Sequence, residues 1–265
     1  MFVDSHCHLT DGNLISRLDS VLLDMAKAGV DRALTIGTTL PDSQCNLQLV
    51  QPYANLWCSV GVHPEESGEP QPTIDELVHL AANKKVVAIG ETGLDYFHFP
   101  DQSREQLQWQ HDRFETHIEA ARRADLPLII HSREAAEGSL AILSAAVQKT
   151  NTLRGVFHCF SENADVAKRV LDLGFYISLS GILTFKSAGM LRDVAKQLPR
   201  ERVLIETDSP YLAPVPYRGK INTPAYVPYV AAELAKIWHT DIEEVAHVTS
   251  QNFDNLFTRV KNETT

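Results

Sequence analysis

Histidines and carboxylates recur in this sequence at the ends of short apolar runs, where they could bind divalent cations. His6 and His8, one residue apart, close the first run of the chain. Glu91 follows a later run and has a glycine on either side in Gly-Glu-Thr-Gly, and Asp208 closes the last run. Imidazole is a common ligand for zinc, manganese and nickel, and carboxylates bind most divalent cations. These residue types indicate metal-assisted hydrolysis if the fold brings them together.

Three further histidines follow apolar residues in the same way. They are His63, His131 and His158. A histidine in such a place is usually a core residue satisfied by hydrogen bonds, but its occurrence beside carboxylates favours metal binding. Because alternate residues of a strand face the same side, His6 and His8 are expected to point together, with Asp4 behind them to orient a ring.

The apolar runs that precede these residues have the length and composition of buried strands. They are residues 2–8, 32–37, 56–63, 86–93, 127–131, 155–160, 175–179 and 202–208. Several are almost continuously apolar, which is typical of parallel strands buried on both faces.

Segments with helical spacing separate the runs. They are residues 14–28, 41–53, 74–83, 103–125, 136–149, 164–173 and 188–198, and two more, 226–238 and 242–260, end the chain. Thr73 and Asn163 are suitable N-caps. Eight alternations of strand and helix predict an α/β fold, a single-domain TIM (β/α)₈ barrel over residues 1–265. In this fold the active site lies at the carboxyl ends of the strands, where the histidines and carboxylates are expected to meet.

Composition and charge restrict the partners. The formal net charge is −10, so a basic surface that coats nucleic acid is excluded, and a nucleic-acid substrate would have to be held locally. We found no signal peptide and no apolar run of membrane-spanning length, and the four cysteines contain no Cys-x-x-Cys pair. We expect a cytoplasmic protein with reduced thiols and no membrane partner; the oligomeric state is not readable, although a monomer is favoured.

The residues that carry this pattern also carry a family resemblance. The motifs are Val-Asp-Ser-His-Cys-His-Leu at 3–9, Gly-Val-His-Pro at 61–64, Ile-Gly-Glu-Thr-Gly-Leu-Asp-Tyr at 89–96, Ile-His-Ser-Arg at 130–133, His-Cys-Phe at 158–160, Ser-Gly-Ile at 180–182, Glu-Thr-Asp-Ser-Pro-Tyr-Leu at 206–212 and Arg-Gly-Lys-x-Asn at 218–222. In this order they resemble the TatD family of metal-dependent deoxyribonucleases.

The resemblance implies two divalent cations, which could be zinc, manganese, magnesium or nickel. It implies that the first is held by His6, His8, Glu91 and Asp208, and that the second is held by Glu91, His131 and His158. It also implies hydrolysis of DNA or of another phosphodiester, with His63 on the substrate side of the site.

On this basis we expect catalytic roles for Asp208, which would accept the proton of the attacking water, and for Glu91 and His63. Four cationic residues on loops after the strands are expected to contact substrate phosphates together with His63. They are Arg133, Lys186, Arg218 and Lys220.

Other functions stay open. An amidohydrolase or lactonase shares the His-x-His strand, but a modified lysine usually bridges its metals where Glu91 stands here. Deacylation of aminoacyl-tRNA would use the same site. A metal-binding protein without turnover belongs to a different class, and its closed ligand sphere would distinguish it from an enzyme.

Overall fold

A computed structural model of the chain describes residues 1–149 and 152–263. Its eight strands pair in chain order into one parallel sheet. The strands are β1 (Phe2–Cys7), β2 (Val30–Thr35), β3 (Leu56–Val60), β4 (Val86–Asp95), β5 (Leu128–Arg133), β6 (Gly155–Phe157), β7 (Tyr176–Leu179) and β8 (Val203–Ile205).

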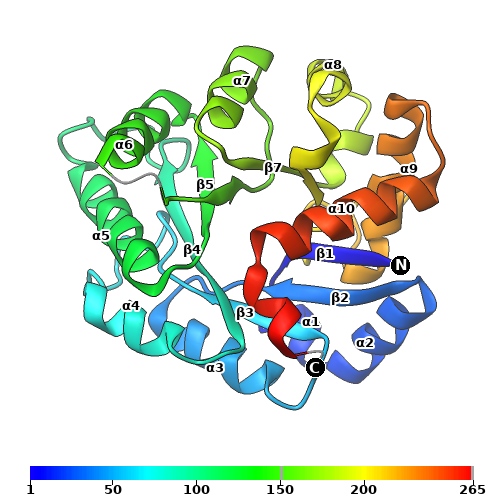
Figure 1. Cartoon of the computed structure of the whole chain (residues 1–265), viewed down its shortest axis with the longest axis horizontal. Helices are drawn as coiled ribbons and strands as arrows, with labels where there is room; N and C mark the ends of the chain where they lie inside the picture. Colours follow the sequence, from blue (N-terminus) through cyan, green and yellow to red (C-terminus); the bar gives the residue numbers. More distant parts are fainter. Residues whose placement is uncertain (150–151, 264–265) are drawn as a thin grey trace.

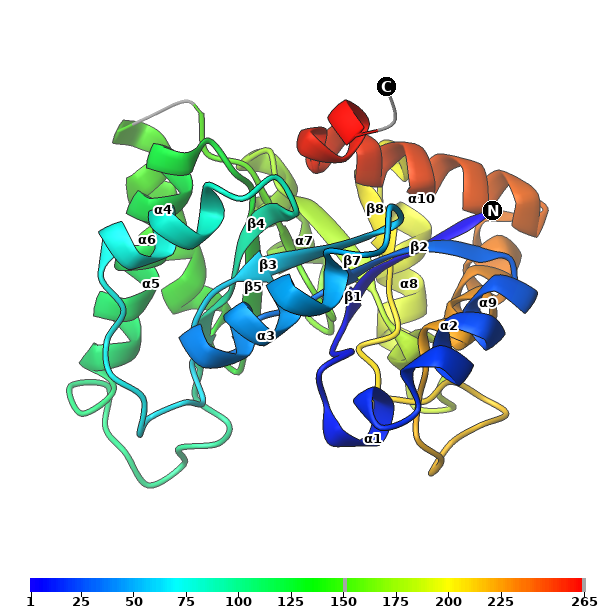
Figure 2. The ribbon, with the colours of Figure 1, turned by 90° about the horizontal axis from the view of Figure 1, so that it is seen from below.

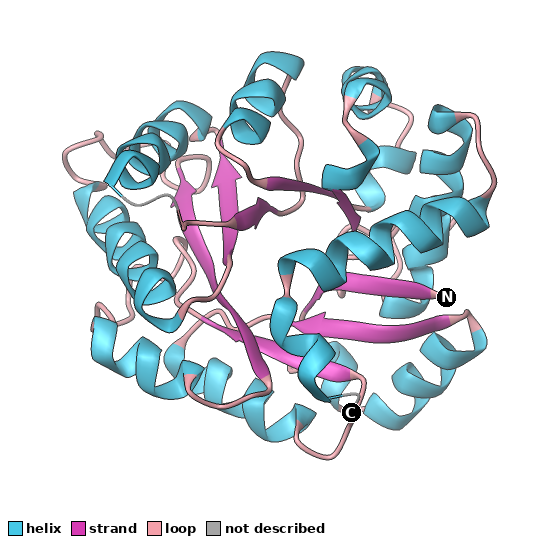
Figure 3. Ribbon diagram, in the orientation of Figure 1, coloured by secondary structure: helices cyan, strands magenta, loops and turns pink. Residues whose placement is uncertain are grey.

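Helices surround the strands (Figure 1). They are α1 (Gly12–Ile15), α2 (Leu18–Lys27), α3 (Leu40–Val50), α4 (Ile74–Ala81), α5 (Gln108–Ala124), α6 (Ala136–Lys149), α7 (Ala164–Asp172), α8 (Gly189–Gln197), α9 (Val227–Trp238) and α10 (Ile242–Leu256). Short 3₁₀ helices span Gly181–Thr184, Arg200–Arg202, Pro224–Tyr226 and Thr258–Glu263. Figure 3 shows the strands enclosed by these helices, and the predicted TIM barrel is confirmed.

The barrel is nearly closed between β1 and β8. Cys7 and Ser209 form a parallel bridge, and the Asp208 amide donates to the His6 carbonyl oxygen at 2.9 Å. Below them the Asp4 carboxylate accepts hydrogen bonds from the amide and the hydroxyl of Thr207. The seam therefore brings residues about 200 positions apart in sequence into direct contact.

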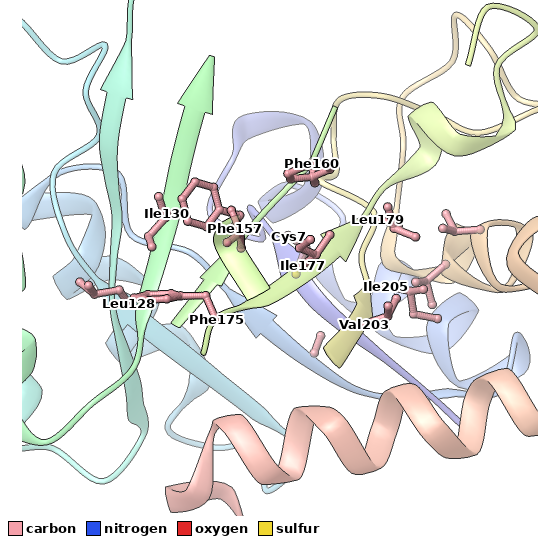
Figure 4. Packing of buried hydrophobic residues seen from close by; sticks show 14 of the residues in the cluster. Cys7, Leu128, Ile130, Phe157, Phe160, Phe175, Ile177, Leu179, Val203 and Ile205 are labelled. Carbon is pink, nitrogen blue, oxygen red and sulfur yellow. The ribbon is translucent and has the colours of Figure 1, made fainter. Parts of the chain in front are cut away.

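Two apolar layers stabilise the barrel. The outer layer lies between the strands and the helices, and Figure 4 shows part of it, with Phe157, Phe175 and Ile177 packed together. The inner layer fills one end of the barrel with side chains from every strand, and Phe253 of α10 and Phe257, which follows α10, close that end. Figure 2 shows α10 at this end and the long connecting loops at the opposite end.

The predicted elements agree with the structure except at their ends. The helix predicted over 14–28 is two helices, because Arg17 leaves the helical region with φ −135° and ψ 30°. The helix predicted from residue 103 begins at Gln108, and Ser103 instead pairs with Gln106 in a turn. Thr73 and Asn163 cap α4 and α7 as predicted. The helices of the described residues include none with the length and apolar character of a membrane span.

Candidate metal centre

The seam between β1 and β8 places three of the predicted ligands together. His6 lies in β1, His8 follows its last residue, and Asp208 follows β8 in the left-handed region with φ 57°. The Asp208 Oδ1 atom lies 3.5 Å from His6 Nε2 and 3.3 Å from His8 Nε2. A non-glycine residue rarely adopts a positive φ, and here it turns the carboxylate toward the two imidazoles.

Glu91 lies at the centre of the site and is buried in β4. Its Oε2 atom faces His6 Nε2 at 3.3 Å, whereas Oε1 lies 3.0 Å from His131 Nδ1 and 2.6 Å from His158 Nε2. The two oxygens of one carboxylate therefore face two different sets of imidazoles.

Glycines on both sides of Glu91 let β4 approach β5 at this level. A Cβ atom on Gly90 would lie 2.6 Å from the Ile129 carbonyl oxygen, and one on Gly93 would lie 2.0 Å from that of His131. Both glycines have φ above 130°, a conformation that residues with a side chain rarely adopt. Glycine at these two positions thus sets the distance between Glu91 and His131.

His131 has a carboxylate on each side of its ring. Its Nε2 atom lies 2.8 Å from Oδ2 of Asp95, and its Nδ1 atom lies 3.0 Å from Oε1 of Glu91. Both carboxylates can only accept, so each ring nitrogen has a partner for the hydrogen of a neutral ring. The Nδ1 atom also lies 3.3 Å from His158 Nε2 and therefore faces the other candidate ligands.

His63 faces Glu91 through its Nε2 atom, whereas His131 does so through Nδ1. Its Nδ1 atom accepts from the Glu65 amide at 3.2 Å, so the hydrogen of the neutral ring is on Nε2, which lies 3.1 Å from Glu91 Oε1. An imidazole nitrogen that carries hydrogen does not bind a metal ion. Although His63, Glu91 and His131 are close enough to form a ligand group, this pattern makes His63 a hydrogen-bond donor.

Helix α5 supports the mouth of the barrel, the end where the carboxyl ends of the strands meet, with buried polar side chains near His63 and Asp95. Gln110 pairs with both backbone groups of Asp95, at 2.9 Å each. Arg113 donates to the carbonyl oxygens of His63, Glu66 and Glu69, and thereby holds the loop that carries His63. Helix α5 therefore anchors the end of β4 and the loop that carries His63 through side chains that do not line the cleft.

Burial and neighbouring charges shift the pKa values of the central groups in opposite directions. Burial disfavours the charged form of Glu91, but His158, His63 and His6 outweigh it and lower the pKa of this carboxylate well below its usual range. Burial also disfavours charge on His158, yet Glu91 and Glu206 raise the pKa of this imidazole well above its usual range. The two shifts have one cause: the Glu91 carboxylate and the imidazoles around it stabilise each other's charged forms.

The donor set fits divalent cations. Both ring nitrogens of His6 are buried and form no hydrogen bond, an arrangement that is costly unless another partner binds them. Its Nε2 atom belongs to two groups of ligand atoms, each with all members within 4.8 Å of one another. These groups are His6, Glu91 and His158, and His6, His8 and Asp208. Nitrogen and oxygen donors of this kind suit zinc, manganese or nickel.

The group opens into a cleft of about 720 Å³ at the carboxyl ends of the strands. Arg133 lines the cleft, and its guanidinium stacks on Phe97 at 3.9 Å. The other cationic residues predicted to contact substrate do not line it. Lys186, Arg218 and Lys220 are exposed, and their role stays a prediction.

One prediction about the site is wrong, and three supporting residues were missed. Asp4 does not orient the His6 ring, because both nitrogens of that ring lack a hydrogen bond and Asp4 binds Thr207 instead. The supporting roles of Asp95, Gln110 and Arg113 were not predicted from the sequence. The signal for Asp95 was its spacing, since in a strand it faces the same side as Glu91. Buried polar residues of a helix leave no comparable signal.

Comparison with known proteins identifies the family. The model of the family described as TatD related DNase matches residues 3–258. The chain belongs to the TatD family. A TatD-family metal-dependent hydrolase is therefore the enzyme class, and the His, Glu and Asp groups at the mouth are its candidate metal ligands.

Relatives match along nearly the whole chain. The "uncharacterized metal-dependent hydrolase YcfH" of Escherichia coli K12 is 46% identical over 259 residues, which cover 96% of this chain and 95% of that protein. YabD of Bacillus subtilis, with the same description, is 35% identical and is covered to 99%. The crystal structure of YjjV, a TatD homologue from E. coli, superposes with a TM-score of 0.89 at 28% identity, covering 97% of this chain and 98% of that one.

Proposed function

We propose that this protein is a deoxyribonuclease that hydrolyses DNA phosphodiester bonds with two divalent cations. The proposal rests on the position of Glu91, whose two carboxylate oxygens face separate sets of ligand atoms in one cleft. The description of the family as related to DNases supports the choice of substrate.

The residues divide into two ligand sets. His6, His8, Asp208 and Glu91 Oε2 would hold one ion, and Glu91 Oε1, His131 Nδ1 and His158 Nε2 would hold the other. Two bound cations would polarise the scissile phosphoryl group and lower the pKa of the attacking water. A glutamate at position 91, where amidohydrolases and lactonases usually carry a modified lysine, favours this function over those two.

Three residues would act directly on the substrate. Asp208 would accept the proton of the attacking water; burial disfavours its charge, but His8 and His6 outweigh burial and keep its pKa below the usual range. His63 would donate its Nε2 hydrogen to a phosphoryl or leaving oxygen. Arg133 would bind a phosphate, held in place by its stacking on Phe97.

The charge of the cleft limits how the substrate is held. Asp11, Asp42, Glu65 and Glu66 line the cleft together with the ligands, and Arg133 is its one arginine or lysine among the described residues. A long polyanion would therefore be attracted mainly by the cations and Arg133, not by the walls.

Since all four cysteines are free, we also propose a reducing, cytoplasmic location.

The test is a substrate panel with defined metals. The chain is depleted of metal, reloaded with zinc, manganese, nickel or magnesium, and assayed on single-stranded DNA, duplex DNA, RNA, aminoacyl-tRNA, lactones and amides. We expect DNA hydrolysis that depends on the added metal and is lost in Asp208→Asn. Turnover of lactones and amides alone, of aminoacyl-tRNA alone, or metal binding without any turnover would contradict the proposal.

A further inference from the structure

Asp95 is buried at the end of β4 and contacts a proposed metal ligand from behind. Its Oδ2 atom accepts from His131 Nε2 at 2.8 Å, on the side of the ring opposite to Glu91. We propose that Asp95 is a positioning residue, which fixes His131 as the tautomer that turns the Nδ1 lone pair toward the second cation. This inference rests on the proposed two-metal site.

Asp95 is itself held rigidly. Gln110 binds both of its backbone groups, and the Tyr96 amide after it donates to the Arg133 carbonyl oxygen across the sheet at 3.0 Å. The backbone amide of His98 donates to Oδ1 at 2.9 Å. One oxygen of the carboxylate thus accepts from a backbone donor, and the other lies 2.8 Å from His131 Nε2 and 3.0 Å from His98 Nδ1.

The need for this contact follows from competition between two acceptors. Glu91 Oε1 lies 3.0 Å from His131 Nδ1 and would accept a hydrogen from that atom. A ring with its hydrogen on Nδ1 would satisfy Glu91 but would have no lone pair for a metal there. Asp95 offers the alternative acceptor at Nε2, and a carboxylate behind a metal-binding histidine fixes its tautomer in this way.

Asparagine at position 95 should reverse the tautomer with little change in shape. The His98 amide can only donate, so the side-chain oxygen must stay at the Oδ1 position and the NH₂ group must face His131 Nε2. That nitrogen then has to accept, and the hydrogen of a neutral ring moves to Nδ1. The ligand set of Glu91, His131 and His158 would lose a donor, whereas the set of His6, His8 and Asp208 would not.

The experiment titrates zinc into metal-depleted wild type and Asp95→Asn and follows the two binding steps by calorimetry, with metal content checked by mass spectrometry. We expect one step to be unchanged and the other to weaken about 10- to 100-fold in Asp95→Asn. The control is His98→Ala, which removes the other side chain on Asp95 but keeps the backbone amide, and should bind two ions as wild type does.

A spectroscopic measurement separates positioning from a general loss of structure. Spectra of the chain with ¹⁵N-labelled histidine should show hydrogen on Nε2 of His131 in zinc-loaded wild type and on Nδ1 in Asp95→Asn. Two ions bound with wild-type affinity in Asp95→Asn, equal weakening of both steps, or hydrogen on Nδ1 in wild type would overturn the inference. If wild type binds two ions but cleaves no DNA, only the proposed substrate fails.

Discussion

The two ends of the barrel interior are built from opposite kinds of side chain. At the floor, the end that α10 covers, Val3, Leu34 and Trp57 belong to one apolar cluster with Phe253 of α10 and with Phe257 just after it. At the mouth, the same strands present imidazoles and carboxylates whose nitrogen and oxygen atoms lie about 3 Å apart. A few residues along each strand separate the two environments.

One end of the barrel stabilises the fold, and the other end holds the groups that could do chemistry. Apolar burial at the floor stabilises the folded chain and tolerates no polar atom without a partner. The mouth concentrates titratable groups and leaves both nitrogens of His6 without a hydrogen bond, and a cation bound by Nε2 would relieve the cost at that atom. Changes at the mouth should therefore affect hydrolysis, and changes at the floor should affect the free energy of unfolding.

The largest effect is expected from Glu91→Gln at the mouth. Loss of the shared charge should release bound metal and reduce DNA hydrolysis on the order of 10³-fold or more, since metal catalysis contributes several kcal/mol to the rate. Metal content and initial rates are measured on the same sample. Glu66→Gln, which lines the same cleft, is the matched control and should retain its metal. A fully active Glu91→Gln would contradict the claim that hydrolysis depends on the groups at the mouth.

A substitution at the floor should change the free energy of unfolding and leave metal binding unchanged. Phe253 is fully buried and contacts Phe257 and Trp57, so Phe253→Ala should lower the free energy of unfolding by about 3–5 kcal/mol. Urea denaturation measures this loss, with Phe253→Leu as the control expected to lose less. Metal bound per folded chain should stay at the wild-type level, and a loss of metal at full folding would show that the two ends are not independent.

The smallest effect concerns pH and His117 of α5. Its Nε2 atom accepts from the Val62 amide at 3.0 Å, its Nδ1 atom donates to the Arg113 carbonyl oxygen, and burial lowers its pKa to about 4. Between pH 6.5 and 4 the unfolded chain takes up a proton that the folded chain does not, so stability falls as the pH falls.

This contribution should amount to about 2 kcal/mol between pH 7 and 5. The mouth imidazoles His8, His131 and His158, whose pKa values are raised, contribute with the opposite sign. The difference between wild type and His117→Gln cancels those terms. Denaturation at both pH values should show a smaller acid loss in the variant, and an equal loss would refute the role of His117.

The sequence predicted the barrel and the meeting of the candidate ligands at one rim, because both depend on strand ends. Apolar runs mark parallel strands, and polar residues after them must meet at one rim, so His8, His158 and Asp208 were placed correctly on that rim. The predicted strand over 86–93 contains Glu91 but stops short of Asp95, because two glycines interrupt the apolar pattern of a strand that continues to residue 95. Local composition indicates where a strand begins better than how far it runs.

The remaining features depend on contacts that are distant in the sequence. Arg133, the last residue of β5, lines the cleft, whereas Lys186, Arg218 and Lys220 lie on loops and do not, because loop paths are set by tertiary packing. Arg218 stacks on Phe185, for example, at 3.6 Å. The hydrogen-bond partners of His63 and His131 include Glu65 and Asp95, whose positions only the folded chain defines.

The most direct test of the central claim is anomalous diffraction from crystals grown with manganese or zinc. We predict two peaks about 3.5–4 Å apart on either side of Glu91. One should lie among His6, His8 and Asp208, and the other between His131 Nδ1 and His158 Nε2. A mouth without peaks, or a single ion that does not contact Glu91, would contradict the account.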